Sequence, residues 1–298
     1  MTATVAVDPG VMGNVMINYL ALVLFEPLFK QLNTYIIAYT EGHLKLSKKL
    51  GIIQTRGLGD IIIALPIALH YHEQGYHVHW PVVDSWVEQL TAQAPWVKWI
   101  PIQPDQGAFF YETPMARLKN FKMDEIICLY QALTGHPEFT SEPWFQHTAF
   151  DQYKYIRAGV PFKDKLRLPE CITRDPQREA LLYDKIIGSD TTPYVVTHLS
   201  SSEQTVRFDP QIIPEGWRVI PIGQEGRIFD WIKIIEGAEV IIMTDSVFAN
   251  LVDGLDIQGP ERYFIAQHHI QLSATLLGNW GYLPNPDLKP TARIFGAS

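Results

Sequence analysis

Hydrophobic residues along the chain gather in short runs, each followed by a turn and then by apolar positions with helical spacing. The clearest run covers residues 240–243 and is apolar without a break, and a shorter one ends at Ile53. An unbroken apolar run is typical of a strand that is covered on both faces, as in a parallel sheet. The hydrophobic pattern therefore predicts an α/β protein.

The remaining elements follow from the same periodicities. Helices are predicted over 84–93 and 177–187, and strands over 76–83, 97–102, 125–130, 193–198 and 218–222. Residues 148–168 are predicted as a helix followed by an extended segment. Two stretches, 105–122 and 134–150, are predicted as loops whose aromatic side chains either fill the core or line an acceptor pocket.

The turn after Ile53 carries the first candidate chemistry. Gly57 and Gly59 allow a positive φ and a close approach of a ligand to the backbone. Asp60 stands where the next helix begins, outside the carboxyl end of a strand, which is where open α/β sheets bind ligands. Asp60 is therefore either a functional carboxylate or a helix cap.

A second motif of the same kind follows the apolar run 240–243. Asp245 and Ser246 end the strand, and a helix with an apolar face comes next. The first amides of such a helix lack intrahelical partners and lie at the positive end of its dipole, so they suit a phosphate. One strand–acid–helix motif in each half of the chain predicts two α/β domains that face each other across a cleft.

Both motifs resemble those of the heptosyltransferase family, the glycosyltransferases that extend the inner core of lipopolysaccharide from a nucleotide-activated heptose. The family's first motif is a strand, a turn that ends Gly-Asp, and a helix with a proline about two turns in. Gly59, Asp60 and Pro66 occupy these positions. The resemblance covers about residues 48–280 in order and spacing.

The family's second motif is Asp-Ser/Thr-Gly-x-x-His, which residues 245–250 resemble with two departures. Val247 replaces the glycine that admits a phosphate closely, and Asn250 replaces the histidine. These departures leave the identity of the donor open.

The resemblance implies a GT-B type fold with two Rossmann-like domains. On this basis residues 1–45 form an N-terminal extension with an apolar helix. Residues 46–172 form the acceptor-side domain, and residues 173–298 form the nucleotide-sugar domain with a C-terminal tail.

The hydroxyl-rich turn after strand 193–198 is a candidate cradle for a diphosphate. Ser200 and Ser201 offer hydroxyls and amides, and Arg207 offers a positive charge. The alternative is an ordinary serine-rich loop, and the resemblance favours donor binding. The turn after strand 218–222 begins at Gly223. Glu225 in this turn is positioned like the family's acid that binds the donor ribose, although it could equally be a solvated turn residue.

The resemblance also implies a chemistry. Asp60 is expected to be the general base of an inverting transfer, with Arg56, Gly57 and Gly59 as the acceptor-side loop. The residues expected at the donor are Ser200, Ser201, Arg207, Gly223, Glu225, Asp245, Ser246 and Asn250. The chain contains no Asp-x-Asp element, so we expect no metal and no cofactor besides the nucleotide-diphosphate sugar.

Composition narrows the partners. The formal net charge of −8 gives no electrostatic footprint for nonspecific nucleic-acid binding. The resemblance implies a glycan or glycolipid acceptor. A phage-type enzyme that glycosylates modified DNA bases and an inactive GT-B-like binding module are the alternatives. The two cysteines, Cys128 and Cys171, are too few for a disulfide framework, which fits a cytoplasmic protein of lipopolysaccharide biosynthesis.

The segment Val11 to Phe29 is apolar but contains Asn14, Asn18 and Glu26. It is a poor signal peptide and a marginal membrane span. We expect a helix that packs on the protein or contacts the inner face of the membrane peripherally, and that contributes nothing to the chemistry.

Overall fold

The computed structural model describes residues 48–298 apart from 105–106, 132–147, 202–203, 268–272 and 288–298. The expected helix within residues 11–29 and most of the expected loop 134–150 lie outside the described residues.

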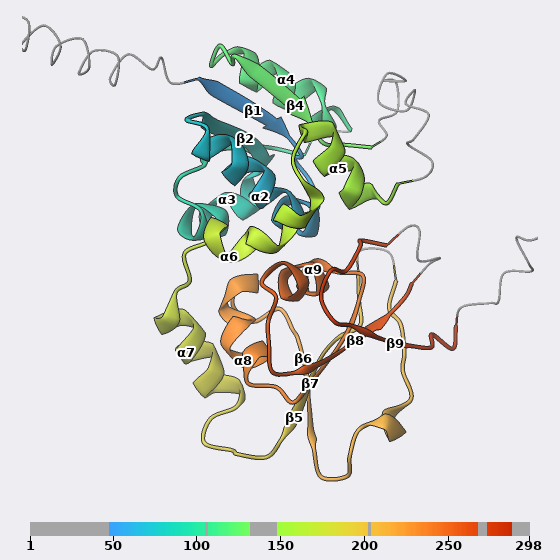
Figure 1. Ribbon diagram of the computed structural model, residues 1–298. Coiled ribbons are helices and arrows are strands. Elements are labelled where there is room, and N and C mark those ends of the chain that lie inside the picture. The colour runs from blue at the N-terminus through green and yellow to red at the C-terminus, as the bar shows by residue number, and fades with distance from the viewer. Residues whose placement is uncertain (1–47, 105–106, 132–147, 202–203, 268–272, 288–298) are drawn as a thin grey trace, which may run out of the picture. The chain divides into compact units, whose positions relative to one another are not determined.

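The first half of the chain forms a four-stranded sheet in which all neighbouring strands are parallel (Figure 1). Its order is β3-β2-β1-β4, with strands β1 (Lys49–Ile53), β2 (His77–Val83), β3 (Lys98–Ile102) and β4 (Glu125–Cys128). The helices of this half are α2 (Leu58–Glu73), α3 (Asp84–Gln93), α4 (Glu112–Lys119), α5 (Phe150–Ala158) and α6 (Leu168–Cys171). The predicted strands are confirmed and differ only at their ends.

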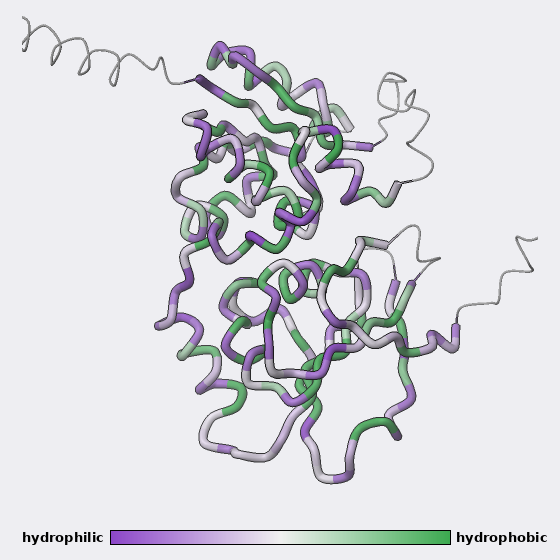
Figure 2. The backbone as a smooth tube through the Cα atoms, in the orientation of Figure 1, coloured by the Kyte–Doolittle hydropathy of each residue, from purple (hydrophilic) through white to green (hydrophobic). Residues whose placement is uncertain are grey.

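The second half forms a separate five-stranded parallel sheet of order β6-β5-β7-β8-β9. Its strands are β5 (Tyr194–His198), β6 (Arg218–Pro221), β7 (Val240–Thr244), β8 (Glu261–Ile265) and β9 (Gly281–Leu283). Its helices are α7 (Pro176–Ile186), α8 (Ile232–Glu236) and α9 (Val247–Gly254). Strands of this sheet stand out as hydrophobic stretches in Figure 2. The α/β class with parallel sheets is therefore confirmed.

The order of the strands places two turns at topological switch points: the turn after β1, which carries Asp60, and the hydroxyl-rich turn after β5. From β1 the chain runs outward through β2 and β3 and then returns to β4 on the other side of β1. From β5 it runs to β6 on one side and returns to β7 on the other. Open α/β sheets bind ligands at such reversals, beyond the carboxyl ends of the strands. The turns after β1 and β5 therefore occupy the ligand-binding position of each sheet.

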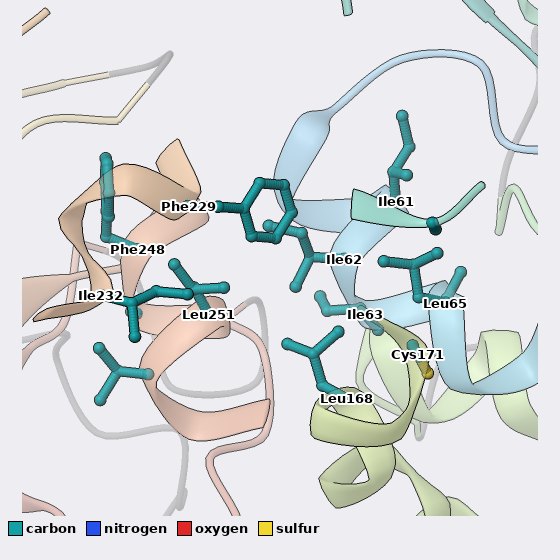
Figure 3. Packing of buried hydrophobic residues seen from close by; sticks show 14 of the residues in the cluster. Ile61, Ile62, Ile63, Leu65, Leu168, Cys171, Phe229, Ile232, Phe248 and Leu251 are labelled. Carbon is teal, nitrogen blue, oxygen red and sulfur yellow. The ribbon is translucent and has the colours of Figure 1, made fainter. Parts of the chain in front are cut away.

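Helix α2 carries the central packing of the molecule. Every residue from Ile61 to Leu69 is buried, including Pro66 inside the helix. A helix that is apolar all round must be covered on all sides. One apolar cluster accordingly contains residues of α2, α6, α8 and α9, among them Ile62, Leu168 and Leu251 (Figure 3). Full burial of each such side chain contributes about 1.5–3 kcal/mol.

Two predicted irregular segments are helical. Within 105–122, where a loop was expected, α4 packs Leu118 close to Gly51 of β1. In the segment expected to be extended, residues Phe162–Arg167 form a 3-10 helix and α6 follows it. Pro169 lies in the first turn of α6, where a proline is tolerated because the missing N–H has no helical partner. Tertiary contacts of Lys165, described below, hold this segment.

Candidate functional site

The turn after β1 is shaped around the carboxylate of Asp60. Gly57 has a φ of 80°, and a Cβ at that position would collide with Asp60 Oδ2. Asp60 lies in the first turn of α2, but the N-cap residue is Gly57 and no side-chain hydrogen bond caps the helix. The interpretation of Asp60 as a helix cap is therefore wrong. Its side chain is 30% exposed.

A buried lysine binds the carboxylate of Asp60. Lys154 of α5 lies with its Nζ 3.0 Å from Asp60 Oδ1, and its side chain is only 3% exposed. The same ammonium donates to Gln54 Oε1 at 2.8 Å and to the carbonyl of Leu129 at 3.3 Å. Sequence reasoning missed Lys154, because nothing in the local sequence distinguishes it from a surface lysine of an amphipathic helix.

Tyr130 fixes the backbone of the turn. Its hydroxyl accepts from the amides of Thr55 and Arg56, at 3.0 and 3.1 Å. Burial raises the pKa of Tyr130 to about 12, so the phenol stays protonated at neutral pH. Because Thr55 Oγ1 donates to the carbonyl of Phe109 at 2.7 Å, the phenol proton goes to Thr55 Oγ1 at 2.9 Å. The guanidinium of Arg56 is exposed and lies 5.8 Å from the ring centroid of Phe110.

The second motif is held mostly by its own helix. Ser246 is the N-cap of α9, and its hydroxyl accepts from the amide of Ala249. Asn250 Nδ2 donates to the carbonyl of Ser246 at 3.0 Å. Asn250 is buried, and its Oδ1 has no hydrogen-bond partner among the described residues.

Asp245 faces the carboxylates of the first half. Burial raises its pKa, and the nearby charges of Asp151 and Asp60 raise it further. The amide of Ala274 donates to Asp245 Oδ2 at 3.3 Å and opposes this shift. Asp60 thus lies close enough to Asp245 to affect the charge of the Asp245 carboxylate.

The two motifs meet at Gly59. A Cβ at this position would lie 3.3 Å from the Cα of Val247 and 3.4 Å from Asn250 Nδ2. The Val247 amide lies 3.6 Å from the same point. The first turn of α2, which carries Asp60, therefore packs directly on the first turn of α9.

Described residues of the hydroxyl-rich turn after β5 are tied to the segment after β8. Ser200 Oγ and Thr205 Oγ1 lie 2.9 Å apart. Ser201 Oγ donates to Gln267 Oε1 at 2.8 Å, and Gln204 Nε2 donates to the Gln267 carbonyl at 2.8 Å. Arg207 is exposed and has no ion pair within the part of the chain that the structure describes.

His198, at the end of β5, joins this turn to α9. Its ring lies 4.8 Å from that of Phe248, between centroids. Burial lowers the pKa of His198 to about 4, so the imidazole is neutral at neutral pH. Its Nδ1 is buried without a hydrogen-bond partner among the described residues. Sequence reasoning had included His198 only as the start of the turn.

Glu225 and Gly223 lie in the turn after β6, apart from these contacts. The Glu225 carboxylate is 53% exposed and lies 3.7 Å from Lys185 Nζ, which is also exposed. Such a surface pair contributes about 0–1 kcal/mol. Within the described ranges no hydrogen bond or ion pair joins Glu225 to Ser200 or Arg207, so its role at a ribose stays a prediction.

Other features bear on the expected ligands. Two cavities of about 580 and 550 Å³ are lined by described residues, and neither includes a residue of the candidate site. Within the described ranges, no three His, Cys, Asp or Glu side chains cluster as metal ligands, and metal independence stays a prediction. No helix among these residues has the length and apolar character needed to span a membrane.

Comparisons with known proteins identify the fold. No family model and no curated protein matches the chain. A glycosyl transferase family 9 structure from Veillonella parvula is 11% identical, with a TM-score of 0.53, over 80% of this chain and 86% of that one. E. coli ADP-heptose lps heptosyltransferase II is 12% identical, with a TM-score of 0.52, over 79% of this chain and 90% of that one. The chain thus shares the fold of these glycosyltransferase structures, which confirms the resemblance at the level of the fold.

Proposed function

We propose that the protein is an inverting glycosyltransferase that moves a sugar from a nucleotide-diphosphate sugar to a hydroxyl of a glycan or glycolipid. One observation carries the proposal. The partly exposed carboxylate of Asp60, at the switch point of the first sheet, lies on the turn that packs against the N-terminus of α9, the helix that follows β7, which is the neighbour of β5 in the second sheet. A base and an anion-binding helix end are what this transfer needs at its two ends.

In the proposed reaction the acceptor hydroxyl oxygen attacks the anomeric carbon of the donor sugar. The bond between that carbon and the diphosphate oxygen breaks, and the electron pair leaves with the diphosphate. The hydroxyl proton passes to Asp60. Arg207, Ser200, Ser201 and the first amides of α9 stabilise the departing charge.

The shared fold supports the proposed donor class. E. coli heptosyltransferase II is named for ADP-heptose, and we extend to this chain only the class, a nucleotide-diphosphate sugar. Glu225 is proposed at the ribose and Asn250 at the donor, in the positions that the resemblance to the heptosyltransferase motifs gives them. The diphosphate is held without a metal, so EDTA is expected to leave transfer unchanged.

The test combines binding with turnover. Thermal shift against a panel of nucleotides and nucleotide-sugars identifies the donor, because a ligand at about a hundred times its Kd stabilises the fold by about 2.7 kcal/mol. With that donor, Asp60→Asn is expected to keep the thermal shift and to lower transfer by roughly 10²–10⁴-fold. Transfer at the wild-type rate would remove Asp60 from the role of base.

A second candidate function is donor binding without transfer. Val247 favours it, because its side chain stands where the family's glycine admits the phosphate closely. In this case the thermal shift would appear, but no acceptor in a panel of glycans and glycolipids would support transfer. Measuring binding and transfer on the same preparation separates the two candidates.

A further inference from the structure

Lys154 is a buried cation whose three acceptors are all defined. Its ammonium contacts Gln54 Oε1, the Leu129 carbonyl and Asp60 Oδ1, at 2.8, 3.3 and 3.0 Å. The ring of Phe150 lies 5.5 Å from the same nitrogen. Taking an ammonium out of water is costly, and an apolar residue of similar size would often stabilise the fold as well. The charge therefore calls for an explanation beyond packing.

A second buried lysine shows what a purely structural role looks like. Lys165 is 1% exposed and lies 3.2 Å from Asp151 Oδ2 and 3.3 Å from Asp253 Oδ2, and both carboxylates are fully buried. Those carboxylates also accept the amides of Thr275 and Gly278. The Lys165 network is closed to water on every side. Lys154 differs, because Asp60, which is 30% exposed, is the only carboxylate paired with it among the described residues.

The charges around Asp60 indicate what the lysine does. Asp245 lies close enough for Asp60 to raise its pKa, and Asp151 acts on Asp245 in the same direction. Tyr130, on the other side, is neutral at physiological pH. Asp60 thus lies near a second carboxylate, and Lys154 supplies the direct positive contact to it. Arg56 is exposed and has its charge near Phe110.

We propose that Lys154 is a positioning residue that binds Asp60 Oδ1, places a positive charge beside the carboxylate and leaves Oδ2 to accept the acceptor's proton. Oδ2 lies over Gly57 and has no hydrogen-bond partner in the described part of the chain. This inference rests on the proposed role of Asp60 as base. Lys154 itself touches no substrate in this account.

The test is the pH profile of kcat/KM in the full-length chain with Lys154→Met. Loss of a positive charge makes a nearby carboxylate easier to protonate. As the pH is lowered, the variant is therefore expected to lose activity at a higher pH than the wild type does. The acidic limb is expected to move up by roughly 1–3 pH units. KM for the nucleotide-sugar is expected to stay unchanged, while Lys154→Arg restores the limb. A folded Lys154→Met protein with the wild-type limb would overturn the proposal.

Two further variants separate charge from packing. Lys165→Met removes the other buried lysine and is expected to lower stability without moving the acidic limb. If Lys154→Met does not fold, Gln54→Glu serves instead, since it is nearly isosteric and adds a second carboxylate beside the same ammonium. Gln54→Glu is expected to move the limb upward, and an unmoved limb in this folded variant would count equally against the proposal.

Failure of the proposed function can be told apart from failure of this inference. If the wild type transfers no sugar, the ¹³C NMR titration of the Asp60 carboxyl still reports the pair without any turnover. A titration midpoint that rises in Lys154→Met supports the pairing and leaves only the reaction in question. A midpoint that stays in place refutes the pairing itself.

Discussion

At position 57 the backbone has a φ of 80°, and Asp60 Oδ2 fills the space that a Cβ would need. Position 57 and the Asp60 carboxylate are therefore coupled, because any side chain at position 57 must displace the proposed base. At the scale of single residues, the proposed site rests on this glycine, on the ammonium of Lys154 and on the exposed cation of Arg207.

Gly57→Ala is expected to lower both stability and transfer. The positive φ costs an alanine about 1–3 kcal/mol, and the added Cβ pushes Asp60 aside. Gly75→Ala is a matched control, because Gly75 has a φ of 89° and nothing within 4 Å of its Cβ position. Urea unfolding should show similar losses for both variants, while transfer falls only in Gly57→Ala. Equal transfer in the two would contradict the coupling.

Arg207→Ala is expected to weaken nucleotide-sugar binding and to slow transfer as well. A guanidinium binds the diphosphate through charge-assisted hydrogen bonds, and the charge on the leaving group grows during the reaction. Arg117→Ala removes an exposed arginine of α4 and serves as the control. Calorimetric donor titration and initial rates measure the two effects. If Arg207→Ala behaves like the control in both, Arg207 is a surface residue only.

At the scale of elements, the contact between α2 and α9 brings the two motifs together. Gly59 permits it, because a Cβ there would stand 3.3 Å from the backbone of Val247. Gly59→Ala is expected to stabilise helix α2 by about 0.5–1 kcal/mol, because alanine favours a helix more than glycine does. This gain offsets the cost of the small shift that Val247 must make to admit the Cβ. Gly59→Val adds branched atoms at the same point and is expected to lower both the unfolding midpoint and the transfer rate. Wild-type values for Gly59→Val would show that the two turns are free to separate.

Sequence periodicity predicted the elements that have an unbroken apolar run or a clear helical spacing, and it missed elements that have neither. β7 is an unbroken apolar run and was predicted, as was α3, where polar and apolar positions follow helical spacing. β8 reads Glu-Arg-Tyr-Phe-Ile and β9 has only three residues, so neither carries a clear signal. The 3-10 helix at 162–167 depends on the buried pairs of Lys165 with Asp151 and Asp253, which no local window contains.

The candidate site was predictable in its turns and not in its contacts. Glycines and acids after apolar strands mark Gly57, Gly59, Asp60 and Asp245 in the sequence itself. The pairing of Asp60 with Lys154 joins α2 to α5, and it arises only when the sheet and its helices are assembled. The same holds for Asn250, whose unpartnered oxygen depends on what surrounds it in the fold.

At the scale of the whole molecule, every residue proposed for binding and chemistry lies within 48–298, which forms a compact unit by itself. A chain shortened to residues 46–298 is therefore expected to bind the same nucleotide-sugar with the same affinity. The solubility of the shortened chain is expected to differ from that of the full chain, because residues 11–29 are strongly apolar. Circular dichroism establishes that the shortened chain is folded, and calorimetric titration with the donor compares it with the full chain. A folded but non-binding shortened chain would assign part of the donor site to the first 45 residues, with Gly10 to Asn14 as the segment to change next.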